Sequence, residues 1–152
     1  MAELIARDLM STDVVSLLKE QSLPYAEELM RLERIRHLPV VDDDGHLVGI
    51  VTHRDLLGAQ VSALTALDEE DKTDLELAVP VAKVMRTDVW TVASDTPALE
   101  AAQILLDHAF GCLPVVDDGV LVGILTEADF LELLVRVLKR GRKEITQEWL
   151  KP

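Results

Sequence analysis

The chain has 152 residues, of which 49% are hydrophobic and 28% are charged, so it has enough apolar side chains for a core and lacks the composition of a disordered chain. Its 15 basic and 28 acidic residues give a formal net charge of -13, which disfavours broad binding to nucleic acid or to anionic membranes. No apolar run reaches the ~20 residues of a membrane span, and the start MAELIARDLM is charged where a secretory signal would be apolar, so we expect a cytoplasmic protein.

The sequence contains an internal repeat. Residues 10–57 align with residues 85–131, and 19 of the 47 aligned positions are identical. Internal similarity of this kind predicts two units of one architecture. We expect a first repeat at 6–67, an acidic connector at 68–80, a second repeat at 81–141 and a tail at 142–152. The tail has two interpretations, a docking segment or the frayed end of a helix.

Each copy opens with the motif M-x-T-D-V and a β-branched run, which predicts a short strand at Val14–Leu17 and at Val89–Val92. Ser22-Leu-Pro24 and Asp95-Thr96-Pro97 follow, each combining a capping oxygen with a proline that the first helical turn tolerates. A helix is expected after each. In the second copy the spacing favours a buried face made by Leu99, Ala102, Leu106 and Ala109, widened by Ala98, Ala101, Ile104 and Leu105.

A hairpin and a second helix complete each copy. The strand LPVVD, a turn containing Gly45 or Gly119, and the strand LVGIVT or LVGILT predict a β-hairpin, and a helix begins near Thr52 or Thr126. Each copy therefore has the order βαββα. Because about 50 residues form only a marginal core, we expect an α/β (α+β) fold with two repeats packed as a pseudo-twofold pair.

The motif Thr-x-x-Asp at the last helix start has two interpretations. Thr52 with Asp55, and Thr126 with Asp129, match a capping box, in which the side chains satisfy free backbone N–H groups. The same helix start also favours a phosphate, and a carboxylate one turn inside it can accept two hydrogen bonds from a ribose diol. Both interpretations stay open on the residues alone.

With M-x-T-D-V, L-P-V-V-D and G-I-(V/L)-T-x-x-D each present twice, the chain resembles the tandem CBS-domain proteins, a family named for cystathionine β-synthase whose paired repeats are also called Bateman modules. The resemblance implies a cleft between the repeats that binds AMP, ADP, ATP or S-adenosylmethionine as a regulatory ligand, with no cofactor required. It also implies roles for individual residues. Ribose would bind Asp55 and Asp129, phosphate would approach Thr52 and Thr126, and adenine would lie near Val14, Val89, Pro39 and Pro114.

The two candidate sites differ in charge. Cationic or titratable residues surround the motif of the first copy: Arg34, Arg36, His37, His53 and Arg54. The aligned residues of the second copy are Ala109, Gly111, Cys112, Glu127 and Ala128. Since arginine donates to phosphate in bidentate fashion and a glutamate repels it, we expect the stronger site at Asp55.

No metal site or active site is expected. The four histidines lack the spacing of metal ligands, and the run Asp42-Asp43-Asp44-Gly45 fits a hairpin turn better than a calcium loop. The only cysteine, Cys112, precedes a core strand and is expected to be a buried, inert thiol.

Two functions remain. In the first, the chain is a regulatory module that senses an adenine nucleotide, signals to an unidentified partner protein and forms a homodimer of CBS pairs. In the second, the repeats are a ligand-free dimerisation or interaction scaffold and the Thr-x-x-Asp motifs are helix caps only. An enzyme would need a base, nucleophile or metal arrangement that the sequence does not offer.

Overall fold

The computed structural model describes residues 3–63 and 79–141, so residues 68–78 of the predicted connector and the predicted tail at 142–152 lie outside the described residues. Within the described ranges, no helix has both the length and the apolar composition that crossing a membrane requires. The secondary structure mixes helices and strands, as predicted.

The first half has the predicted βαββα order, preceded by one short helix. Its elements are α1 (Ala6–Leu9), β1 (Leu17–Leu18), α2 (Leu23–Glu33), β2 (His37–Val41), β3 (Leu47–Thr52) and α3 (His53–Ala63). Ser22 caps α2 by accepting a hydrogen bond from the Tyr25 N–H at 3.3 Å, and Pro24 lies in the first turn, as the sequence predicts.

The second half repeats this plan with one strand fewer. Its elements are η1 (Val81–Lys83), α5 (Ala98–His108), β4 (Cys112–Asp117), β5 (Val120–Thr126) and α6 (Glu127–Arg140). The antiparallel pairs β2–β3 and β4–β5 have equivalent registers, and each has a bulge, after Val40 and after Val115 respectively. Gly45 and Gly119 turn the two hairpins with φ of 82° and 81°, a conformation that favours glycine.

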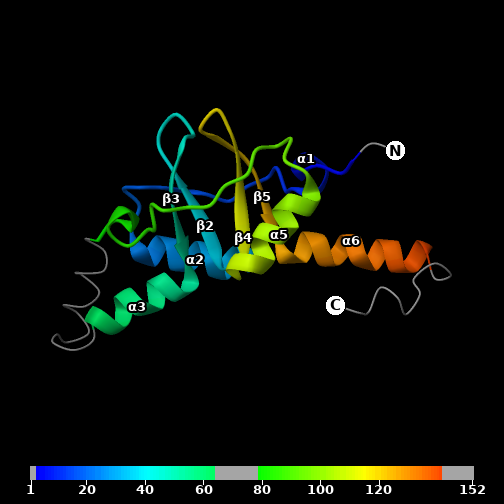
Figure 1. Cartoon of the computed structure of the whole chain (residues 1–152). Helices are drawn as coiled ribbons and strands as arrows, with labels where there is room; N and C mark the ends of the chain where they lie inside the picture. Colours follow the sequence, from blue (N-terminus) through cyan, green and yellow to red (C-terminus); the bar gives the residue numbers. More distant parts are fainter. Residues whose placement is uncertain (1–2, 64–78, 142–152) are drawn as a thin grey trace.

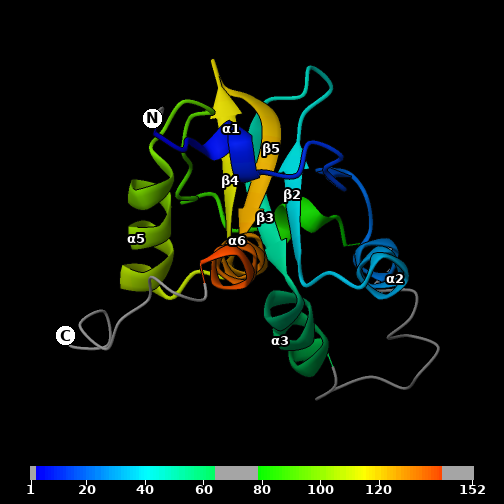
Figure 2. The ribbon, with the colours of Figure 1, turned by 90° about the vertical axis from the view of Figure 1, so that its right-hand side faces the viewer.

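The hairpins stand side by side in the middle of the molecule, with α2 on one outer side and α5 on the other (Figure 2). Helix α2 contacts β2, and α5 contacts β4. Helices α3 and α6 leave the same end of the hairpins and extend in opposite directions (Figure 1). The starts of α3 and α6 therefore lie at one end of the strand layer.

Each half has its own core cluster, and each cluster contains a residue from the other half. Ala6 packs with residues of α5, β4 and β5, whereas Val81 packs with residues of α2, β2 and β3, and both are fully buried. Backbone hydrogen bonds hold these exchanged segments in place, since Ala6 N donates to Thr96 O at 2.8 Å and Val81 N donates to Gln21 O at 2.7 Å. The two repeats therefore complete each other's cores.

The halves are also joined by reciprocal backbone hydrogen bonds. Arg86 and Ile50 exchange two N–H···O bonds of 2.9 Å, and Ser11 and Ile124 exchange two of 3.0 Å. At the hairpin tips, Leu47 N donates to Gly119 O at 3.0 Å, and Leu121 N donates to Gly45 O at 3.1 Å. This arrangement has the predicted pseudo-twofold relation.

Glycine in the second strand of each hairpin permits this close approach. A Cβ atom at Gly49 would lie 2.9 Å from the Cγ of Met85, and one at Gly123 would lie 2.9 Å from the Cγ of Met10. Each methionine belongs to the M-x-T-D-V motif of the opposite repeat. Each M-x-T-D-V motif therefore packs against the hairpin of the opposite repeat.

The predicted first strand is too long in the first half and is wrong in the second half, where no strand forms over Val89–Val92. Of Val14–Leu17 only Leu17 lies in a strand, and of Val89–Val92 only Val92 makes a bridge, to Val115. The residues in between cross from one half to the other: the chain leaves its bridge with Ile124 at Ser11 and reaches β2 only at Leu17. They have no neighbouring strand to pair with, so their β-branched side chains do not produce one.

Two expectations for the second helix are also wrong. Pro97 is the N-cap of α5 and lies before the first turn, because the Thr96 Oγ1 atom accepts from the Ala93 N–H of the preceding turn. The buried face is Ala98, Ala101 and Leu105, while Leu99 and Leu106 are 76% and 77% exposed.

Candidate functional site

Both Thr-x-x-Asp motifs form capping bonds where a helix follows a strand. In the first half, the Thr52 N–H donates to the Asp55 Oδ2 atom at 2.9 Å, and the Asp55 N–H donates to the Thr52 Oγ1 atom at 3.2 Å. In the second half, the Thr126 N–H donates to the Asp129 Oδ2 atom at 2.8 Å. The structural interpretation of both motifs is therefore confirmed, and it leaves the question of a ligand open.

A cleft of about 530 Å³ lies at the start of α3, between the two halves. This volume is within the range of small-molecule sites. The first half contributes residues of β2, β3, α3 and the segment before β2: Arg36, His37, Ile50, Thr52, His53, Arg54 and Leu57. The second half contributes Arg86, Asp88, Val89, Trp90, Ala109, Phe110, Gly111, Cys112 and Pro114.

The structure groups the predicted residues across the repeats. Thr52 and its cationic neighbours share the cleft with Val89 and Pro114, which belong to the second copy. The cause is the backbone pairing of Arg86 with Ile50, which brings the segment after Arg86 against β3. Val14 and Pro39, which belong to the first copy, lie outside this cleft, as do Thr126 and Asp129.

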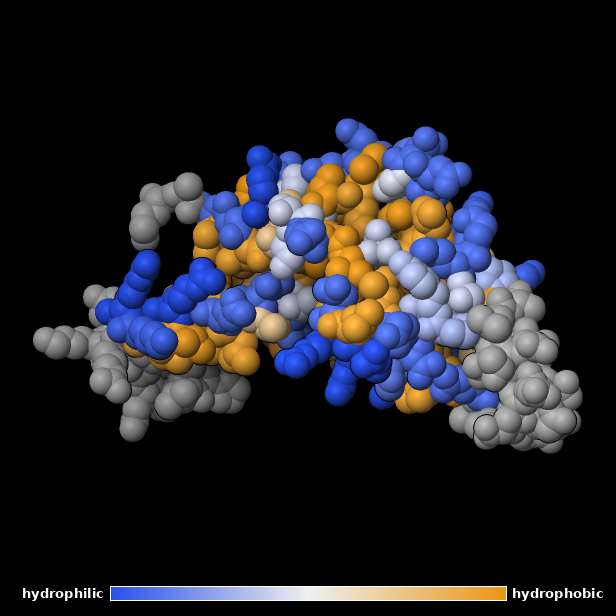
Figure 3. Space-filling view, turned by 180° about the vertical axis from the view of Figure 1, so that it is seen from behind, coloured by the Kyte–Doolittle hydropathy of each residue, from blue (hydrophilic) through white to orange (hydrophobic). Residues whose placement is uncertain are grey.

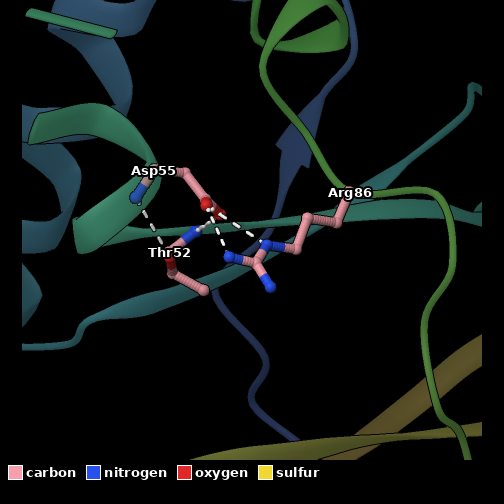
Figure 4. Close-up of polar contacts among 3 residues, drawn as sticks. All are labelled: Thr52, Asp55 and Arg86. Atoms are coloured by element: carbon pink, nitrogen blue, oxygen red, sulfur yellow. Dashed lines mark hydrogen bonds and ion pairs between the residues drawn. The ribbon is translucent and has the colours of Figure 1, made fainter. Parts of the chain in front are cut away.

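Asp55 is not among the residues that line the cleft, but it is bonded to Arg86, which lines it (Figure 4). The Arg86 Nε and Nη2 atoms are both 3.2 Å from the Asp55 Oδ1 atom. The Asp55 side chain is 12% exposed, and that of Arg86 is 63% exposed. The arginine therefore covers the carboxylate from the solvent side and joins the second half to the start of α3.

The cleft has an excess of cationic residues, although the chain is acidic overall. Arg36, Arg54 and Arg86 line it, against one lining carboxylate, Asp88. At the start of α3 the N–H groups of His53 and Asp55 are already bonded, to the Arg36 carbonyl oxygen at 2.8 Å and to the Thr52 Oγ1 atom at 3.2 Å, so the positive potential of the cleft comes from its arginines. The local field therefore favours an anion such as phosphate.

His37 also lines the cleft, as a mainly neutral side chain. Burial lowers the pKa of His37, and the Arg36 guanidinium lowers it further, while Asp55 and Glu127 act in the opposite direction. The imidazole packs against Gly111, where a Cβ atom would lie 2.7 Å from the His37 Nε2 atom. At pH 7 His37 is therefore mainly uncharged and offers shape and hydrogen bonding rather than charge.

An aromatic cluster forms another wall of the cleft. Trp90 and Phe110 line it, and Trp90 is 47% exposed. The ring centroids of Trp90 and His108 are 4.3 Å apart, and those of His108 and Phe110 are 5.2 Å apart in a stacked arrangement. An exposed aromatic face of this kind can stack on a planar heterocycle.

Arg86, Trp90, Phe110 and Asp88 line the cleft but were not predicted as site residues. The signal for three of them was a difference between the copies, since the first copy has Ser11, Val15 and Ile35 at the positions of Arg86, Trp90 and Phe110. Asp88 carries no such signal, because it is matched by Asp13.

The acidic turn is the predicted hairpin turn. The Asp42 Oδ1 atom accepts from the N–H groups of Asp44 and His46 at 3.0 and 2.9 Å. These local bonds explain why the side chains of Asp42, Asp44 and His46 gather there. Cys112 is buried, and burial raises the pKa of its thiol to about 12.

The sequence model of the CBS domain family matches residues 6–62 and 81–136. A CBS domain-containing protein of Dictyostelium discoideum is 33% identical over 138 residues, which are 90% of this chain and 95% of that protein. The homoserine O-acetyltransferase of Methanohalophilus mahii is 32% identical over 127 residues, but the match spans only 23% of its length.

Solved structures show the same fold. The protein of Vibrio cholerae that bears the name acetoin utilization protein (AcuB) has a TM-score of 0.80 and 36% identity, over 95% of this chain and all of its own. CBSX2 of Arabidopsis thaliana in complex with AMP has a TM-score of 0.74 and 29% identity, over 88% of this chain and 97% of its own. The CBS domain pair of protein MJ0100, in complex with 5′-methylthioadenosine and S-adenosyl-L-methionine, has a TM-score of 0.73 and 26% identity, over 89% and 98%.

Proposed function

Since this chain belongs to the CBS-domain family and carries two tandem CBS repeats, we propose that it is a regulatory module that binds an adenine nucleotide in the cleft beside Asp55. In this proposal the ligand bridges the two halves, and its binding is signalled to a partner protein. The module performs no chemistry itself.

The cleft between the halves is the observation that supports this proposal. It combines three arginines, a carboxylate bonded to one of them and an exposed aromatic face. These groups match the parts of a nucleotide, because phosphate binds to arginine, a diol binds to carboxylate, and a purine stacks on an aromatic ring. Relatives of the same fold bind AMP or S-adenosyl-L-methionine.

A thermal-shift series with AMP, ADP, ATP, NAD and S-adenosylmethionine tests the proposal. A ligand present at about 100 times its Kd adds roughly 2.7 kcal/mol to the free energy of unfolding. For a chain of this size the melting temperature rises by about 2 to 4 °C per kcal/mol. We expect a rise of several degrees with at least one adenine nucleotide.

A pair of matched variants locates the site. Asp55→Asn and Asp129→Asn change the same residue type at the same helix position, but only Asp55 contacts a residue that lines the cleft. Calorimetry should give an AMP affinity about 10- to 100-fold lower for Asp55→Asn, because a charged acceptor is lost, and an unchanged affinity for Asp129→Asn. Equal effects of the two changes would contradict the assignment.

We also propose that two copies associate through the C-terminal helix. Helix α6 has apolar residues on one face that are each 42% to 62% exposed, namely Leu131, Leu134, Val135 and Leu138. Figure 3 shows apolar surface along the arm that α6 forms. Exposed apolar surface of this kind favours association with another protein surface.

The cytoplasmic location of the protein stays a prediction from the sequence.

A dimerisation scaffold without a ligand is the second candidate. It is favoured by the pairing within the first motif, because Thr52, Asp55 and Arg86 already bond to one another without a ligand. The thermal-shift series separates the two candidates. A melting temperature that no nucleotide changes, in a chain that still dimerises, would favour the scaffold.

A further inference from the structure

The pairing of Arg86 with Asp55 limits what can bind at the carboxylate. A carboxylate offers about four acceptor positions on two oxygens. In Asp55 the Thr52 N–H occupies Oδ2, and the Nε and Nη2 atoms of Arg86 both reach Oδ1. A ribose diol needs two acceptor positions of its own. A nucleoside that binds Asp55 through its diol therefore displaces Arg86.

Displacement leaves the Arg86 guanidinium without its carboxylate partner inside a cleft that already contains Arg36 and Arg54. A ligand that carries phosphate provides a new anionic partner with the geometry that guanidinium prefers. Adenosine and 5′-methylthioadenosine provide none. S-adenosylmethionine carries a sulfonium and an ammonium group against one carboxylate, so its net charge is positive and three guanidinium groups disfavour it.

We infer that Arg86 is a specificity-determining residue that restricts this cleft to adenosine 5′-phosphates. Arg86 exchanges the Asp55 carboxylate for the phosphate of the ligand, so a phosphorylated nucleoside replaces the ion pair that a nucleoside without phosphate breaks and leaves to water. This inference rests on the proposed function and adds to it the class of ligand.

The other half of the molecule lacks this device. Ser11 occupies the position equivalent to Arg86. The Asp129 Oδ2 atom instead receives the Thr126 N–H at 2.8 Å and lies 3.2 Å from the Thr126 Oγ1 atom. Of the two motifs, only that of Asp55 therefore has an arginine that can move from the carboxylate to a ligand phosphate in the part of the chain that the structure describes.

Calorimetric titration with AMP, adenosine and S-adenosylmethionine tests the inference on the full chain. The unmodified chain should bind AMP at least tenfold more tightly than the other two ligands. Arg86→Gln should weaken AMP binding by roughly 10- to 100-fold, because a charged hydrogen-bond partner of the phosphate is lost. The same change should strengthen adenosine binding, because Asp55 no longer has a competing partner.

Two further variants complete the design. Arg136→Gln removes an equally charged and exposed arginine, 3.6 Å from Glu132 on α6 and outside the cleft, and should leave all affinities unchanged. Arg86→Lys keeps the charge but loses the forked donor geometry, and should give an intermediate AMP affinity. Circular dichroism and tryptophan fluorescence confirm that each variant is folded.

The possible outcomes test the role of Arg86 separately from the proposed nucleotide-binding function. Loss of AMP affinity together with a gain for adenosine in Arg86→Gln supports the inference. If the unmodified chain binds AMP and adenosine equally and Arg86→Gln leaves their ratio unchanged, the inference is overturned and the nucleotide-binding function stands. If the unmodified chain binds neither these three ligands nor any other nucleotide of the thermal-shift series, the proposed function is overturned and the inference with it.

Discussion

Cys112 and His37 occupy equivalent positions at the starts of β4 and β2, and both are partly or fully removed from water. For Cys112, burial lowers the reactivity of the thiol. The thiolate is the reactive form of cysteine, and a pKa of about 12 leaves very little of it near neutral pH. The only cysteine of the chain is thus a packing residue in the cleft wall.

Labelling with a thiol reagent checks this. At pH 8 we expect Cys112 to react roughly a thousandfold more slowly than a free cysteine of ordinary pKa ~8.5, and to reach the ordinary rate in guanidinium chloride. Asp43→Cys, in a Cys112→Ser background, places the thiol on the exposed hairpin turn and should react at the full rate. A rapid reaction of Cys112 in the folded chain would show that the thiolate is stabilised there.

The absence of a Cβ atom at Gly49 allows the two halves to approach each other closely. Alanine at this position places its Cβ 2.9 Å from both the Met85 Cγ atom and the Arg86 carbonyl oxygen. The carbonyl belongs to the backbone pair with Ile50 and cannot move away cheaply. We expect Gly49→Ala to lower the free energy of unfolding by about 1 to 3 kcal/mol, measured in urea.

Gly58 provides the matched control for this change. It lies in α3, and a Cβ atom there meets nothing within 4 Å. Gly58→Ala should therefore raise the free energy of unfolding by up to about 1 kcal/mol, as glycine-to-alanine changes inside helices do. A loss of stability equal to that of Gly49→Ala would contradict the steric explanation.

At the scale of the element, α6 is the helix with the least complete packing. None of its residues is fully buried, and Leu131, Leu134, Val135 and Leu138 follow the spacing of a single face. We expect the chain to sediment as a dimer. Leu134→Asp should shift it to the monomer, because a charge in the centre of an apolar interface is left without a partner.

Leu32 is a suitable comparison for this test. It is 62% exposed on α2, on the opposite outer side of the hairpins from α5 (Figure 2). Leu32→Asp should leave the sedimentation behaviour unchanged. If both variants remain dimeric, the α6 face is not the interface.

The elements also show where sequence patterns succeed and where they fail. Both hairpins and the helix starts at Thr52 and Thr126 could be predicted, because turn glycines and capping residues act locally. The buried face of α5 was placed wrongly because apolar residues surround most of that helix. Its polar residues, Glu100, Gln103 and Asp107, lie opposite Ala98, Ala101 and Leu105, so the polar side identifies the orientation better than the leucines do.

At the scale of the whole molecule, the exchange of α1 and η1 couples the two repeats. Val81 belongs to the second repeat in sequence but is fully buried in the core of the first. We expect Val81→Ala to lower the free energy of unfolding by about 2 kcal/mol and to destabilise both halves together, because neither core is complete without the other repeat.

Two probes measure this coupling. The fluorescence of Trp90, in a Trp149→Phe background, reports on the second half, and circular dichroism reports on both. The two urea transitions should coincide in the parent chain and shift together in Val81→Ala. Separate transitions would show that each repeat folds alone.

The same coupling explains which parts of the site the sequence did not reveal. The cationic residues near Thr52 were identified because they adjoin a motif. That Val89 rather than Val14 shares their cleft depends on the pairing of Arg86 with Ile50, which no local pattern predicts. Trp90 and Phe110 are 20 residues apart in sequence and meet only in the folded chain.

The bonds that hold the hairpin tips together run from main chain to main chain, from Leu47 to Gly119 and from Leu121 to Gly45. Such bonds do not depend on the side chains of the residues that make them, so the two repeats can share one backbone frame while their side chains differ in charge and shape. Arg86, Trp90 and Phe110, which stand where the first repeat has Ser11, Val15 and Ile35, are differences of this kind.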